Sequence, residues 1–123
     1  MIMLYRAEIE MRLPSLNTYI NVCRTNKFQA ASFKRKYESE IGYFLQGIPT
    51  IEKPVIIHFH WIEPNRRRDL DNIAFGKKFI LDAMVKKGIL IDDSARFVKG
   101  FSDTFELGKT AKIVVTLQEV END

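Results

Sequence analysis

The chain has little of what marks disulfide-stabilised, zinc-binding or membrane proteins. Its 123 residues include a single cysteine, Cys23, and two histidines. An intrachain disulfide and a zinc site built from cysteines are therefore excluded. No apolar run approaches the length of a membrane span, and the first residues lack the basic segment and apolar stretch of a secretory leader. We expect a cytoplasmic protein with no membrane partner.

Neither sign of charge dominates the sequence. Lys+Arg number 19 and Asp+Glu number 16, so the formal net charge is only +3. This small excess decides little about nucleic-acid binding, for which the distribution of charge matters more. With 46% hydrophobic residues and no low-complexity tract, residues 1–123 are expected to form one globular domain.

Hydrophobic periodicity predicts four strands and two main helices. Apolar and polar residues alternate, or apolar residues cluster between turn signals, in the strands expected at residues 3–11, 55–62, 96–106 and 110–119. Apolar residues recur at spacings of three and four in the helices expected at residues 28–46 and 71–87. This order predicts an α+β fold, a mixed and mostly antiparallel sheet of about four strands backed by two main helices.

Local signals place the ends of two of these elements. Asp71 suits the N-cap of the second helix, and Gly88 suits the position just after its last turn. Gly108 and Lys109 predict a tight turn that joins the last two strands as a hairpin.

The most informative stretch occupies residues 66–72 and reads Arg-Arg-Arg-Asp-Leu-Asp-Asn. Asp69 and Asp71 supply carboxylates at a spacing that can close on one Mg²⁺ or Mn²⁺, hard cations that prefer oxygen ligands. The bland alternative is a helix N-terminus carrying acids that suit its dipole, worth about 0.3–1 kcal/mol each. That alternative leaves Arg66, Arg67 and Arg68 unexplained, whereas a protein that holds and cuts a polyphosphate backbone needs both groups.

A second acidic pair, Asp92-Asp93, follows about twenty residues later and could be either a third ligand or a solvated turn. Bringing another carboxylate within about 4 Å of the first pair costs about 4 kcal/mol at an effective dielectric near 20, so such a cluster needs a cation. A helix over 71–87 is about 24 Å long, and the residues from Gly88 to Asp93 retrace at most about 20 Å. Either the helix breaks near Gly76, or Asp93 completes a site across a subunit boundary.

Several other polar residues have more than one interpretation. Lys77 and Lys78 lie in the predicted helix, where most lysines are simply solvated. Asp82 lies about 16 Å along the helix from Asp71, too far for a shared ion, which favours a structural role. His58 and His60 share a strand face, but no third zinc ligand is nearby. A basic cluster on the outer side of helix 28–46 consists of Lys34, Arg35 and Lys36.

These motifs together resemble the signature of RusA-type endodeoxyribonucleases, the Holliday-junction resolvases. The resemblance covers most of the chain. It is carried by the run at 66–73, by Leu-Asp-Ala-Met at 81–84, by Gly-Ile-Leu-Ile-Asp-Asp at 88–93 and by Pro-Ser-Leu-Asn at 14–17. It implies a small homodimeric nuclease that binds four-way DNA junctions and nicks two strands symmetrically with Mg²⁺ or Mn²⁺.

The resemblance also implies roles for particular residues. The family's three catalytic, metal-binding aspartates fall on Asp69, Asp71 and Asp93. Its catalytic lysine falls on Lys78 when counted back from Asp82, but on Phe75 when counted forward from Asp71. The chain thus carries about three extra residues here, and Lys77 remains the alternative.

The implied chemistry is metal-assisted phosphodiester hydrolysis, with Lys78 stabilising charge on the phosphate or the leaving oxygen. The DNA-binding residues are expected to be basic residues that track the backbone without reading bases. They are Arg66, Arg67, Arg68, Lys34, Arg35, Lys36 and Lys77. Two other classes stay open: a branched-DNA-binding module that does not cut, and a metal-dependent hydrolase of small nucleotides.

The aromatic content favours a homodimer as well. Nine phenylalanines, four tyrosines and one tryptophan are many for so small a domain to bury alone. Phe97, Phe101 and Phe105 alternate along one strand face, and Phe79 flanks its helix, so an apolar surface is expected to be left over for a partner. The alternative is that helices of the same chain cover it.

Overall fold

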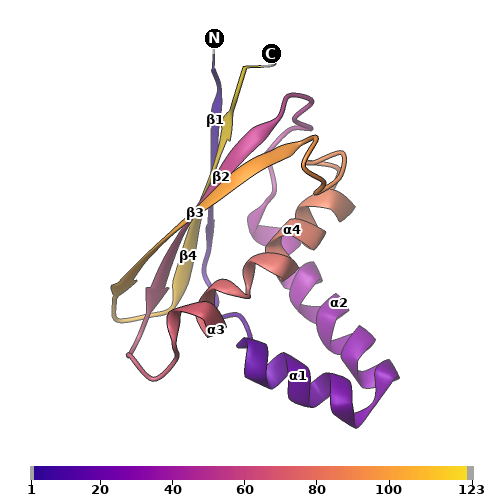
Figure 1. Cartoon of the computed structure of the whole chain (residues 1–123), viewed down its shortest axis with the longest axis vertical. Helices are drawn as coiled ribbons and strands as arrows, with labels where there is room; N and C mark the ends of the chain where they lie inside the picture. Colours follow the sequence, from indigo (N-terminus) through magenta and orange to yellow (C-terminus); the bar gives the residue numbers. More distant parts are fainter. Residues whose placement is uncertain (1, 122–123) are drawn as a thin grey trace.

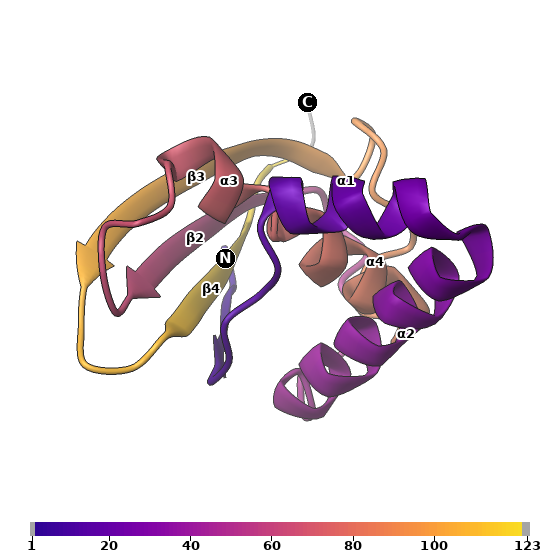
Figure 2. The same cartoon turned by 90° about the horizontal axis from the view of Figure 1, so that it is seen from below.

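The computed structural model, which describes residues 2–121, is an α+β domain whose helices lie on one face of a four-stranded sheet (Figure 1, Figure 2). Its strands are β1 (Leu4–Ile9), β2 (Val55–Glu63), β3 (Val98–Leu107) and β4 (Lys112–Glu119). Its helices are α1 (Leu16–Thr25), α2 (Lys27–Phe44), α3 (Leu70–Ala74) and α4 (Lys77–Lys86). The predicted fold class is confirmed, including the mixed and mostly antiparallel sheet.

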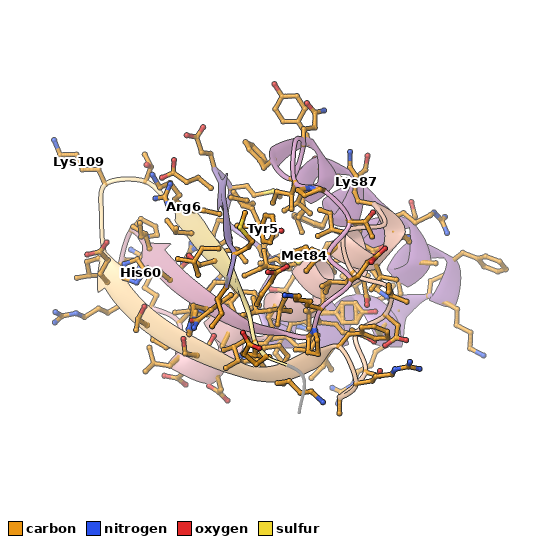
Figure 3. All side chains as sticks on the ribbon, turned by 90° about the horizontal axis from the view of Figure 1, so that it is seen from above. Tyr5, Arg6, His60, Met84, Lys87 and Lys109 are labelled. Atoms are coloured by element: carbon orange, nitrogen blue, oxygen red, sulfur yellow. The ribbon has the colours of Figure 1, made fainter. Side chains whose placement is uncertain are left out.

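The sheet has the order β1-β4-β2-β3. β4 is antiparallel to both β1 and β2, whereas β2 and β3 are parallel. A parallel pair needs a long crossover, and the segment with α3 and α4 provides it. The inward residues of β2, from Val55 through Trp61, are almost fully buried and pack against Ile41 of α2 and Phe79 and Met84 of α4. Figure 3 shows Met84 within this layer between sheet and helices.

The predicted hairpin of the last two strands is wrong, because β2 lies between β3 and β4. The turn at 108–111 instead crosses the end of β2, where the Gly108 N–H donates to the carbonyl of Glu63 at 3.0 Å. A Cβ at Gly108 would come within 2.6 Å of Ile62 Cγ2, so the crossing requires a residue without a side chain. The turn signal itself was correct, and the strand pairing was not.

The predicted helix over 71–87 breaks at Phe75 and Gly76 into α3 and α4. Gly76 packs tightly at this point. A Cβ there would lie 3.1–3.2 Å from atoms of the Leu13 and Trp61 side chains. The break therefore brings the backbone between the two helices directly onto the core, and it leaves α3 as a short helix at the end of the sheet (Figure 1).

The sequence pattern did not predict α1. This helix is only ten residues long and buries none of its residues fully. Its start is set by Ser15, whose Oγ accepts from the Thr18 N–H at 3.2 Å. Asn26 then ends α1 and caps α2 by accepting from the Phe28 N–H at 2.7 Å.

The outer face of the sheet is polar and carries the two histidines. The ring nitrogens of His58 pair with Ser102 and Gln118, and those of His60 pair with Thr104 and Glu106. Among residues 2–121, none of the helices combines the length and apolar character that crossing a membrane requires.

Candidate functional site

Asp69 and Asp71 stand at the start of α3, as predicted, but the predicted N-cap, Asp71, is wrong by two residues. Asp69 is the N-cap residue, with an extended backbone (φ −68°, ψ 154°), but its carboxylate caps no helix N–H. Asp71 lies in the first turn, and both residues are exposed. Within residues 2–121, neither carboxylate is engaged in a side-chain hydrogen bond or ion pair. Neither acid thus caps the helix through its side chain, and their oxygens suit a hard divalent cation.

Asp93 lies in the loop that follows α4, where Gly88 turns the chain with a φ of 76°. Asp92 is tied into this loop because its Oδ1 accepts from the Ser94 N–H at 2.8 Å. Hydrogen bonding to the Ser94 hydroxyl and backbone N–H lowers the pKa of Asp92. Asp93 is exposed and makes no such bond within the described residues.

The structure does not bring Asp93 to the first pair within one chain. The loop lies at the far end of α4 from α3 (Figure 1), and α4 spans ten residues, about 15 Å. Among residues 2–121, no three His, Cys, Asp or Glu side chains are grouped closely enough to hold a metal ion. The break at Gly76 thus exists, but it does not bring Asp93 to Asp69 and Asp71 within one chain.

The other aspartates of the described chain are all engaged. Asp82 accepts ion pairs from Lys34 at 2.6 Å and Lys78 at 3.3 Å. Asp103 binds Lys77 at 2.6 Å and accepts the indole N–H of Trp61 at 2.8 Å. These contacts agree with the structural role expected of Asp82, and they set Asp69, Asp71 and Asp93 apart from the remaining aspartates.

The two candidate lysines point to different sides of α4. Lys77 is held by Asp103, with its Nζ 5.3 Å and 4.8 Å from the ring centroids of Phe59 and Phe101. Lys78 is more exposed, at 55% of its side chain, and faces Asp82. In this arrangement Lys77 anchors α4 to β3, and Lys78 is the lysine with the freer ammonium group. Their roles with DNA stay predictions.

The three arginines at 66–68 differ in exposure and in hydrogen bonding. Arg66 and Arg67 are exposed, and the Arg67 N–H donates to Asn65 Oδ1 at 3.0 Å in a tight turn. The Arg68 guanidinium instead donates to the carbonyl of Leu13 at 2.8 Å. Its partial burial lowers the pKa of Arg68. Arg68 therefore ties the segment before α1 to the start of α3, whereas the other two remain available to phosphates.

The second basic cluster, Lys34 to Lys36, lies on α2. Lys34 is drawn toward α4 by Asp82, which raises the pKa of the Lys34 ammonium through their hydrogen bond. Arg35 and Lys36 are exposed on the same helix. Within this cluster, Arg35 and Lys36 have the solvent-facing position expected for contacts with a DNA backbone.

Asn72 and Glu63 have roles that the sequence did not reveal. Asn72 Oδ1 accepts from the Asn17 N–H at 3.2 Å, which links α3 to α1. Glu63 is only 7% exposed and forms an ion pair with Arg12 at 2.9 Å. It continues the inward alternation of β2 by one step beyond Trp61, a signal that could have predicted a buried carboxylate.

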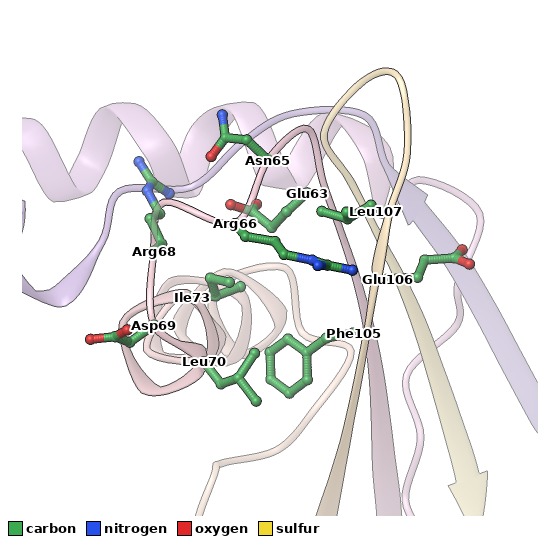
Figure 4. A pocket seen from close by; sticks show the side chains of 10 residues that line it. All are labelled: Glu63, Asn65, Arg66, Arg68, Asp69, Leu70, Ile73, Phe105, Glu106 and Leu107. Atoms are coloured by element: carbon green, nitrogen blue, oxygen red, sulfur yellow. The ribbon is translucent and has the colours of Figure 1, made fainter.

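A cavity of about 380 Å³ opens beside Asp69 and was also not predicted (Figure 4). Its walls come from the end of β2 and the following loop, from the start of α3 and from the last residues of β3. The lining residues are Glu63, Asn65, Arg66, Arg68, Asp69, Leu70, Ile73, Phe105, Glu106 and Leu107.

Comparison with models of known protein families found no match, and comparison with curated proteins found none either. The resemblance to RusA-type resolvases therefore rests on the sequence motifs quoted above.

Proposed function

We propose that this protein is a divalent-metal-dependent endodeoxyribonuclease that acts on branched DNA, with the four-way junction as its substrate. The proposal rests mainly on which aspartates have a side-chain hydrogen-bond or ion-pair partner. Within residues 2–121, the three without a side-chain partner are Asp69, Asp71 and Asp93, the same three that the motif assigns to metal binding.

The donor chemistry of these residues fits Mg²⁺ or Mn²⁺. Exposed carboxylates with unengaged oxygens are the ligands that hard cations select. When bound, such an ion neutralises charge on a phosphate and lowers the pKa of a bound water. Because a single chain does not gather the three acids, the site is completed in this proposal by Asp93 of a second copy.

The basic residues supply the other half of the function. Arg66 and Arg67 stand in the turn just before Asp69, so a phosphate that contacts them lies next to the two carboxylates. Arg68 fixes this turn against Leu13 and so holds the two exposed arginines next to the aspartates. Lys78, at the start of α4, is placed to contact the backbone on the other side of the helix break.

The first test is Asp71→Asn, which removes a charged ligand while keeping the size of the side chain. We expect junction cleavage with Mg²⁺ to fall by on the order of a thousandfold or more. Junction binding should be kept or tightened, because one repulsion with the phosphates is lost. Cleavage and binding are measured on a labelled four-way junction and on linear duplex, with and without Mg²⁺.

The matched control is Asp82→Asn, which changes a carboxylate on the following helix, α4, that is engaged by lysines. This variant should keep substantial activity. If Asp71→Asn cuts junctions at the parent rate, the assignment of Asp71 to the metal site is wrong. If Asp82→Asn is folded but inactive, Asp82 belongs to the active site. If the parent shifts junctions without nicking them, the protein is a branched-DNA-binding module instead.

A further inference from the structure

The cavity beside Asp69 is large enough to take a small ligand. Its volume of about 380 Å³ is within the range of ligand pockets, and its lining combines apolar with polar and charged side chains. Leu70 and Phe105 give it apolar walls, and Leu70 is 57% exposed although large and hydrophobic. Of the three proposed metal ligands, Asp69 is the one that lines this space.

A buried carboxylate lies in the wall of this cavity. Both Arg12 hydrogen bonds, from Nε at 3.1 Å and Nη2 at 2.9 Å, go to Oε1 of Glu63. Within residues 2–121, Oε2 of Glu63 accepts no hydrogen bond. Among the described residues, Oε2 of Glu63 is not one of the fully buried side-chain oxygens that lack a hydrogen bond, so it is accessible from the cavity. The cavity therefore offers one strong acceptor to a ligand that carries an N–H group.

The remaining walls suit a flat ligand. The ring of Phe105 faces the cavity, and the side chain of Arg66 extends across it toward β3 (Figure 4). Aromatic rings and guanidinium planes are the surfaces on which unstacked bases stack. A phosphate is not favoured inside, because Glu63 contributes negative charge, but Arg66 and Arg68 at the rim suit the phosphates that flank a base.

We propose that this cavity holds one unstacked nucleobase from the branch point, next to the phosphate at Asp69. The base would stack on Phe105 and donate an N–H from its edge to Glu63. This inference rests on the proposed function, since a branch point offers bases whose extrusion costs less than from an intact duplex. It gives the protein a means of reading base identity in addition to junction shape.

The first experiment places the fluorescent base 2-aminopurine at the branch point of a four-way junction. It is carried out with the Asp71→Asn protein, so that no strand is cut. Binding should change the fluorescence as the base leaves its stack and enters the cavity. Phe105→Leu, added to this protein, should abolish the change and weaken junction binding on the order of tenfold.

The matched control is Phe101→Leu, on the same face of β3 but outside the cavity. It should keep the signal and the affinity. An unchanged signal in the Phe105 variant, or an equal loss in the Phe101 variant, would overturn the proposal. If 2-aminopurine responds as expected but the parent protein cuts no junction, the cavity proposal stands and the nuclease proposal fails.

The second experiment compares Glu63→Gln with Glu38→Gln, another buried, ion-paired carboxylate, which is distant from the cavity. Cleavage rates of the parent and both variants are measured on junctions that differ only in the base at the branch point. Glu63→Gln should change the ratio of rates between bases severalfold, and Glu38→Gln should leave that ratio constant. A constant ratio in both variants would mean that Glu63 is only structural, and the base-reading proposal would be rejected.

Discussion

At the scale of single residues, the arginine run shows how neighbours in sequence take different tasks. Arg68 turns inward to Leu13, while Arg66 and Arg67 remain exposed. A sequence pattern of three identical residues cannot distinguish these roles, because the difference comes from a carbonyl more than fifty residues away. A substitution of Arg66 or Arg67 should therefore affect DNA binding alone, whereas a substitution of Arg68 should also affect the fold.

Arg67→Ala is expected to weaken binding to every DNA by a similar factor. It should also reduce the slope of log affinity against log salt by about one unit, the effect of one lost phosphate contact. The measurement is junction and duplex affinity across a salt series. Arg6→Ala on β1, whose partner is Glu8 on the outer face of the sheet, is the control and should leave the slope unchanged.

A different outcome is expected for Arg68→Ala, because this change also removes the hydrogen bond to Leu13. Its free energy of unfolding should fall by about 1–3 kcal/mol, which Arg67→Ala should not cause. If Arg67→Ala lowers stability and leaves the salt slope intact, Arg67 holds the fold and does not contact phosphate.

At the scale of elements, α2 and α4 are joined by buried and half-buried charges as well as by apolar packing. Lys34 and Lys86 reach from these helices to Asp82 and Glu38 on the other. The hydrogen bond to Asp82 raises the pKa of Lys34 above its ordinary value of 10.5. The protonated lysine is thus favoured by folding. Its contribution to stability is complete below pH 10.5 and is lost as the pH rises through the raised pKa.

Lys34→Met is expected to lower the free energy of unfolding by about 1 kcal/mol at pH 7. The difference from the parent should shrink above pH 10.5, where the parent loses the same interaction. Urea unfolding at pH 7 and at increasing pH up to 11.5 measures it. Lys36→Met, on the exposed side of α2, should show little effect at either pH. A difference that is constant with pH would show that packing of the lysine stem is responsible, not its charge.

The elements also show how far the sequence could predict the fold. β2 and α2 were predictable because each has a continuous periodic pattern and buries one face. α1 was missed because its ten residues give an apolar pattern few repeats. The pairing of β3 with β2 was missed because the turn signal at Gly108 is local. Only the contact of Gly108 with Ile62 and Glu63 reveals that the turn crosses a third strand. Likewise, the motifs selected three aspartates, and the length of the predicted helix raised the question of whether Asp93 is separated from the other two without deciding it.

At the scale of the whole molecule, the aromatic residues divide between core and surface. Trp61, Phe59 and Phe79 are fully buried, so helices of the same chain cover much of the apolar surface that was expected to remain. Leu107 on β3 and Leu70 on α3 are still 50% and 57% exposed. Both line the cavity beside Asp69, and a second copy would have to approach here to bring Asp93 to Asp69 and Asp71.

We therefore expect a homodimer with shared sites, and complementation between inactive variants tests it. In a dimer of this kind, Asp71→Asn and Asp93→Asn each inactivate both sites. A mixed dimer of the two variants, however, carries both changes in one site and neither in the other. Mixing them should restore cleavage through single nicks, without the paired nicks of the parent. Sites formed within one chain would give no restoration, because each would still lack one aspartate. Sedimentation at micromolar concentration gives the independent check: a monomer that cuts junctions would exclude both the dimer and the shared site.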